Sequence, residues 1–107
     1  MLCITQQRLN VIQNRIERIK QKLIDVRMMR PGSLTKQLQK RSTTDKVFEY
    51  WQVSYTHRMK SRTDYVRQEM VKETAAQIKE FKKFKKLIDE WIDLAIKQAR
   101  LSAKKTE

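Results

Sequence analysis

Apolar residues recur along the first part of the chain at alternating intervals of three and four positions. The series runs Leu9, Ile12, Ile16, Ile19, Leu23 and Val26. On a helix this spacing forms a narrow apolar stripe, which is the pattern of a coiled-coil seam. The only proline and the only glycine follow at Pro31 and Gly32 and are expected to end a helix before them. We therefore expect a first helix over about residues 4–29.

The last third of the chain carries a broader apolar pattern, which no glycine or proline interrupts. Two interleaved series repeat there with helical spacing. One comprises Ile78, Phe81, Ile88, Ile92, Ala95 and Ala99, and the other Phe84, Leu87, Trp91, Leu94 and Leu101. We expect a helix over about 69–101 and a disordered tail over 102–107. The first helix has one seam and covers one series, so the other needs the middle segment or a second copy. The pattern favours a homodimer and leaves a monomer open.

The middle of the chain contains residues that suit extended structure. Residues 47–56 are rich in aromatic and β-branched side chains, and residues 61–66 can pair with them. The connection between them lacks Gly and Asn, which predicts a four-residue loop rather than a two-residue turn. For residues 33–45 we expect a short helix capped by Ser33, or a loop. The expected fold is mainly α (α+β), with a long helix, a β-hairpin over about 47–66 and a second long helix. The two helices pack as an antiparallel coiled-coil-like pair in a single domain over 1–107.

Composition narrows the classes of protein that remain. The 107 residues include one Cys, one His and one Gly, so neither a Cys/His zinc set nor a glycine-rich phosphate loop is present. No apolar run reaches the length of a membrane span, and we expect no signal peptide and no membrane contact. His57 stands beside cations, and the carboxylates are spread among lysines. We expect a cytoplasmic protein that is not an enzyme, with no catalytic residues, no cofactor and no metal.

The chain is strongly basic, and the charge is unevenly distributed. Lys and Arg number 25 against 12 Asp and Glu, which gives a formal net charge of +13. Such an excess favours an anionic partner, and cations on a two-stranded ribbon suit phosphates. The residues predicted to bind nucleic acid are Arg30, Lys36, Lys40, Arg41, Arg58, Lys60 and Arg62. Three tyrosines, Tyr50, Tyr55 and Tyr65, can stack on bases if the ligand is single-stranded.

Four segments occur in the order found in a known family. They are RPGSL at 30–34, YWQVSYT at 50–56, KSRTDYV at 60–66 and FKKFKKLI at 81–88. In these segments the chain resembles a short bacterial family of uncharacterised proteins that are often found near mobile elements. The resemblance implies the same order of elements but no enzymatic activity. Family members carry a Cys-rich cluster before the first strand, whereas residues 40–46 contain no Cys here, so no metal is expected.

Two functions of different classes follow from these patterns. The first is a small nucleic-acid-binding protein, an accessory factor of a mobile element, that contacts phosphates through the hairpin and the preceding segment. The patterns leave DNA and RNA open. The alternative is a helical module for protein–protein interaction or assembly, with an acidic protein as a possible partner. The predicted interface consists of Phe84, Leu87, Trp91 and Leu94.

Overall fold

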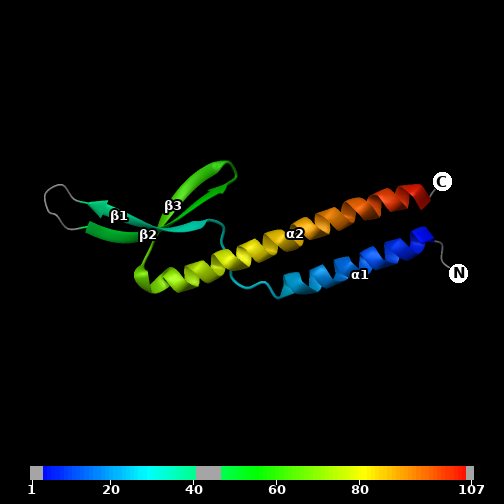
Figure 1. Ribbon diagram of the computed structural model, residues 1–107, viewed down its shortest axis with the longest axis horizontal. Helices are drawn as coiled ribbons and strands as arrows, with labels where there is room; N and C mark the ends of the chain where they lie inside the picture. Colours follow the sequence, from blue (N-terminus) through cyan, green and yellow to red (C-terminus); the bar gives the residue numbers. More distant parts are fainter. Residues whose placement is uncertain (1–3, 41–46, 106–107) are drawn as a thin grey trace. The chain divides into compact units, whose positions relative to one another are not determined.

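The computed structural model describes residues 4–40 and 47–105 (Figure 1). The elements are α1 (Ile4–Ile24), β1 (Ser33–Lys40), β2 (Val47–His57), β3 (Lys60–Val66), a 3₁₀ turn (Gln68–Met70) and α2 (Val71–Lys105). The expected mainly α fold, with a hairpin between two long helices, is confirmed. The chain divides into two compact units, which are Met1–Val26 with Lys83–Glu107, and Arg27–Lys82. We call the first the helix pair and the second the sheet unit. The single domain stays a prediction.

The helix pair is held together by the seam that the heptad spacing predicts. In Figure 1, α1 and the C-terminal part of α2 lie side by side and run in opposite directions. Ile12, Ile16 and Ile19 of α1 are buried against Leu87 and Leu94 of α2. Each buried aliphatic side chain contributes about 1.5–3 kcal/mol through removal from water. The antiparallel coiled-coil-like pair is therefore confirmed, because one apolar stripe on each helix closes on the other.

The sheet unit contains a three-stranded antiparallel sheet in the order β1-β2-β3. Leu34 pairs with Val53, and Val53 in turn pairs with Asp64, so this part of β2 is hydrogen-bonded on both sides. The side chain of Val53 is completely buried. Gly32 lies against it, with φ of +135°, a conformation that favours glycine. A close approach of the backbone to Val53 thus explains why the only glycine stands at this position.

The strand β1 corrects the short helix or loop expected over 33–45. Leu34 and Leu38 are four positions apart, which suits one face of a helix and also one face of a strand. The choice is made by β2, because residues 33–40 pair with residues 47–54 over their whole length. Strand pairing supplies backbone hydrogen bonds that an isolated eight-residue helix cannot hold in water. Residues 41–46 lie outside the described residues.

The turn of the hairpin corrects the expected four-residue loop. His57 pairs with Lys60, so only Arg58 and Met59 connect β2 to β3. Their φ angles are +52° and +65°, and positive values at both central positions are what a type I′ turn requires. This turn matches the twist of the flanking strands, and that match outweighs the absence of Gly and Asn.

Both helices end at positions different from those expected. α1 ends at Ile24 rather than near 29, because Asp25 N–H and Val26 N–H donate to carbonyls three residues back and tighten the last turn. The backbone that follows α1 is bound to α2, because the Arg27 N–H donates to the Glu80 carboxylate and the Arg30 N–H donates to the Gln77 carbonyl. At the other end, α2 continues through residues 102–105, where a disordered tail was expected. Residues 106–107 lie outside the described residues.

Candidate nucleic-acid interface

The tip of the β2–β3 hairpin gathers positive charge on one side of the ribbon. The register sets His57 opposite Lys60 and Tyr55 opposite Arg62. Directly opposed residues of an antiparallel pair share a face of the sheet. Together with Arg58 they line a shallow pocket of about 360 Å³. Among the described residues that line it, none carries a carboxylate.

All the cations of this pocket are accessible. Arg58, Lys60 and Arg62 are exposed, and so is His57. Neither their guanidinium groups nor the Lys60 ammonium appears in an ion pair among the described residues. On the opposite face of the ribbon, the hydroxyls of Thr56 and Ser61 share a hydrogen bond of 2.9 Å. The tip therefore presents positive charges and hydroxyl groups to solvent within a few residues of the turn.

Arg30 has a different role from the predicted phosphate contact. Its Nη2 donates to Asp64 Oδ2 at 2.8 Å, and its guanidinium lies 5.4 Å from the ring centroid of Tyr55. Its Nε is buried and, among the described residues, has no hydrogen-bond partner. Arg30 thus ties the segment before β1 to both strands of the hairpin, and its charge is already compensated.

Two of the three remaining predicted cations, Lys36 and Lys40, lie on β1. Lys36 Nζ lies 2.9 Å from Glu49 Oε2 on the sheet, in an ion pair that is half exposed on both sides. Such half-exposed pairs contribute little, about 0–1 kcal/mol. Lys40 is the last residue of β1, and Arg41 lies outside the described residues. Of the six predicted residues that the structure describes, only those of the tip are brought into this pocket, where His57 and Tyr55 join them.

The opposite face of the sheet is uncharged, and sequence reasoning missed it because β1 was not recognised as a strand. The pairing aligns only hydroxyl, amide and aromatic side chains on that face. They are Ser33, Thr35, Gln37, Gln39, Phe48, Tyr50, Gln52, Ser54, Thr56, Ser61, Thr63 and Tyr65. The Tyr50 and Tyr65 rings meet edge to face, with centroids 5.7 Å apart, and Tyr65 is 80% exposed. Tyr55 lies on the other face under Arg30, so it is not free to stack on a base.

The predicted protein interface is used inside the chain. Leu87 and Leu94 are buried in the core of the helix pair, and Trp91 packs against that core. Phe84 is half-buried on the same helix. Leu87, Leu94 and Trp91 are therefore part of the contact that α2 makes with α1, which corrects their assignment as an exposed assembly surface. The physical reason is that the seam of α1 covers Leu87 and Leu94 of this series, whereas Ile92 of the other series is 50% exposed. The assignment of Phe84 stays a prediction.

The described residues also bear on metal binding and on membrane insertion. Within residues 4–40 and 47–105, no group of three or more His, Cys, Asp or Glu side chains is placed to hold a metal ion. No helix in the described part of the chain has the length and apolar character needed to cross a bilayer. Comparison with protein-family models, with curated proteins and with solved structures finds no match to this chain. The resemblance to a family associated with mobile elements stays a prediction.

Proposed function

We propose that this protein binds nucleic acid and that the phosphate backbone contacts the tip of the β2–β3 hairpin. The observation that carries the proposal is the pocket formed by Tyr55, His57, Arg58, Lys60 and Arg62, with no acidic side chain among its described lining residues. Guanidinium and ammonium groups form short, charge-assisted hydrogen bonds with phosphate oxygens. A cluster of uncompensated cations at the end of a narrow projection is suited to a repeating polyanion.

The shape of the projection supports the same ligand. β1 pairs with β2 only as far as Ser54, so from Tyr55 onward β2 and β3 continue as a short two-stranded antiparallel ribbon that ends in a two-residue turn. Such a ribbon fits the major groove of duplex DNA. The formal charge of +13 adds a long-range attraction that steers a polyanion toward the protein. An accessory role at a mobile element is the biological setting that the family resemblance implies.

The proposal is tested with the double variant Arg58→Ala/Arg62→Ala and a fluorescently labelled duplex, followed by fluorescence anisotropy at several salt concentrations. Each lost phosphate contact removes one released counterion, so the slope of log K against log salt becomes shallower by about 2. We expect the affinity at low salt to fall about tenfold or more.

The matched control is Lys72→Ala/Lys79→Ala, which removes the same charge from exposed positions on α2 in the sheet unit. It changes the long-range attraction but not the contacts at the tip. Equal losses in the two double variants, with circular dichroism unchanged in both, would overturn the tip as the binding site.

Tyr65 separates single-stranded from duplex ligands. Its ring is exposed on the uncharged face of the sheet, where a base of a single strand can stack on it, with a contribution of about 1–3 kcal/mol. Tyr65→Ala is therefore expected to weaken binding of the single strand and to leave binding of a duplex unchanged. Tyr65, the more exposed ring of the Tyr50–Tyr65 pair, therefore distinguishes binding of a single strand from binding of a duplex.

A further inference from the structure

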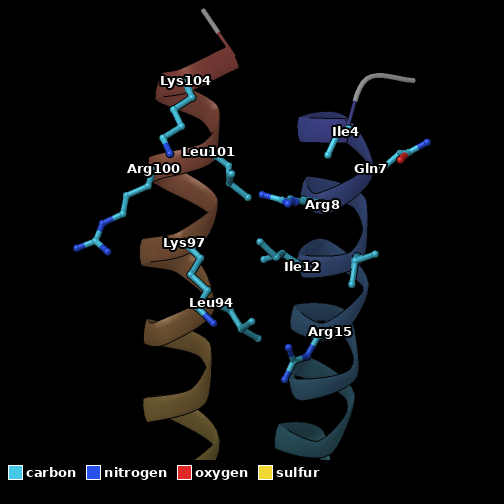
Figure 2. Close-up of a pocket in the computed structure, with 11 residues that line it drawn as sticks. Ile4, Gln7, Arg8, Ile12, Arg15, Leu94, Lys97, Arg100, Leu101 and Lys104 are labelled. Atoms are coloured by element: carbon cyan, nitrogen blue, oxygen red, sulfur yellow. The ribbon is translucent and has the colours of Figure 1, made fainter. Parts of the chain in front are cut away.

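The helix pair carries a groove that the proposed function does not use. It lies between the first turns of α1 and the last turns of α2 and has a volume of about 660 Å³. In Figure 2, Arg8 and Ile12 point from α1 toward α2, and Leu94 and Leu101 point back toward α1. The groove is formed within one compact unit, so its geometry does not depend on the hairpin.

The floor of the groove is apolar, and on each helix two of its apolar residues are seven positions apart. Ile4 and Val11 line it from α1, and Leu94 and Leu101 line it from α2. The two positions on α1 are far from covered, with 69% of Ile4 and 59% of Val11 exposed. A seven-residue repeat of apolar positions is the surface that a further helix packs against in a coiled coil.

We call the charged side chains that line the groove its rim; they are all basic, and on each helix two of them are seven positions apart. Arg8 and Arg15 stand on α1, and Lys97 and Lys104 stand on α2. Arg100 also lines the groove, although Figure 2 shows its side chain directed away from α1. Among the described lining residues none is acidic. Cations seven residues apart on each of the two helices match carboxylates at the e and g positions of a third helix.

We infer that this groove binds an acidic amphipathic helix of a partner protein and so completes a three-helix bundle. The apolar a and d positions of the partner lie on Val11 and Leu101, and its flanking Asp and Glu side chains pair with the basic rim. A nucleic acid has no apolar stripe to cover the floor, so this surface and the hairpin tip recognise different ligands. Apolar anchors supply most of the binding energy, and the charges set orientation and partner choice.

A second copy of this chain fits the groove less well. The exposed apolar positions of α2, Ile92 and Ile96, stand beside Asp89 and Asp93. Those two acids are four residues apart, whereas the cations on each side of the rim are seven apart. Each copy also brings a formal charge of +13 to a rim that is already positive. Charge and spacing together favour an acidic partner of different sequence.

The probe is a synthetic helical peptide of about three heptads, with Leu at a and d and Glu at e and g. A second peptide of the same composition in scrambled order controls for general attraction to a basic protein. Binding to the full chain is measured by isothermal titration calorimetry. We expect the heptad peptide to bind about tenfold more tightly, or better, than the scrambled one.

Val11→Asp tests the floor of the groove and is expected to weaken binding of the heptad peptide about tenfold. Its matched control is Ile92→Asp, which makes the same kind of change at a half-exposed position of α2 outside the groove. The control is expected to change the affinity for the peptide by less than about twofold, because Ile92 lies outside the groove and sites without shared contacts act nearly independently. Because both positions are exposed, circular dichroism should show the helices retained in each variant.

Three outcomes would overturn the inference. The first is equal affinity of the scrambled and the heptad peptide, and the second is an equal loss of affinity in Val11→Asp and Ile92→Asp. The third is a dimer mass in light scattering that Val11→Asp reduces to a monomer, because a second copy would then fill the groove. Arg58→Ala/Arg62→Ala should bind the heptad peptide normally, so failure at the hairpin tip and failure at the groove are distinguishable.

Discussion

The helix pair and the sheet unit are stabilised in different ways. The helix pair buries five aliphatic side chains along a repeated seam. They are Ile12, Ile16, Ile19, Leu87 and Leu94. The sheet unit buries only Val53, Thr74 and Ile78 among its described residues and adds an ion pair at Arg30. A repeated seam spreads stability over equivalent layers, whereas the sheet unit depends on a few individual contacts. Substitutions in the two units should therefore differ in kind.

The largest effect is expected at Gly32, in the sheet unit. A Cβ at this position would collide with Val53 Cγ1 and lie 3.0 Å from the Ser54 carbonyl oxygen, and the φ of +135° would be strained. Gly32→Ala should lower the free energy of unfolding by about 4 kcal/mol, from backbone strain and overpacking together. Urea denaturation followed by circular dichroism measures it. Ser33→Ala, at the exposed neighbouring position, should stay within about 0.5 kcal/mol; equal stability of the two variants would contradict the role given to Gly32.

The next effect is expected in the seam of the helix pair. Ile16 is 2% exposed, and Ile16→Ala removes three carbons from the core. The loss in unfolding free energy should be about 3 kcal/mol, from lost transfer energy and the cavity left behind. The control is Ile24→Ala, since Ile24 is 75% exposed at the end of α1. If thermal melting shows similar losses for both variants, the seam is not the source of stability.

A smaller effect is expected at Arg30, which the sequence assigns to phosphate binding and the structure assigns to support of the sheet. Arg30→Ala removes the ion pair with Asp64 and the contact with the Tyr55 ring. Because the pair is partly exposed, the loss should be only about 1–2 kcal/mol. A double-mutant cycle with Asp64→Asn measures the coupling. Arg30→Ala should leave the salt dependence of nucleic-acid binding unchanged, and a shallower slope would restore Arg30 to the binding surface.

The smallest effect concerns Glu17 on α1. A hydrogen bond from Lys20 at 3.2 Å, and a second from Gln13 at 2.8 Å, lower the pKa of its carboxyl from the ordinary value of 4.5. Since the folded state has the lower pKa, the contribution to stability is present above 4.5 and is lost as the pH falls through the folded pKa. An NMR titration should give a midpoint below 4.5. Lys20→Ala should return it toward that value more than Gln13→Ala does, and the reverse order would contradict the ranking of the two contacts.

The sequence predicts best what is encoded locally. The heptad seam of α1, the long apolar pattern of α2 and the β-branched run of β2 each contain enough periodicity to identify their elements. β1 was missed because the leucines at 34 and 38 suit a helix and a strand equally, and its partner decides between them. The turn at Arg58 and Met59 was missed because the twist of the strands imposes positive φ on residues that seldom adopt it.

The candidate sites divide in the same manner. The cations at the hairpin tip are within five residues of one another, so their proximity follows from a hairpin alone. The role of Arg30 depends on Asp64, which is 34 positions away. The groove depends on the register between two antiparallel helices, which sets Arg8 near Leu101. A sequence shows the heptads of each helix separately, and only the packed pair shows which positions of the two face the same side.

The placement of the two tryptophans gives each unit an optical reporter of its own. The Trp51 indole N–H donates to Gln68 Oε1 at 3.2 Å in the sheet unit, whereas Trp91 lies under the Lys20 ammonium, 5.4 Å from the ring centroid, in the helix pair. One indole thus has an amide neighbour and the other a cation over its π face, so their emission spectra should differ. Each single-tryptophan protein can then follow the melting of one unit, and a shared midpoint would reveal that the continuous helix α2 couples them.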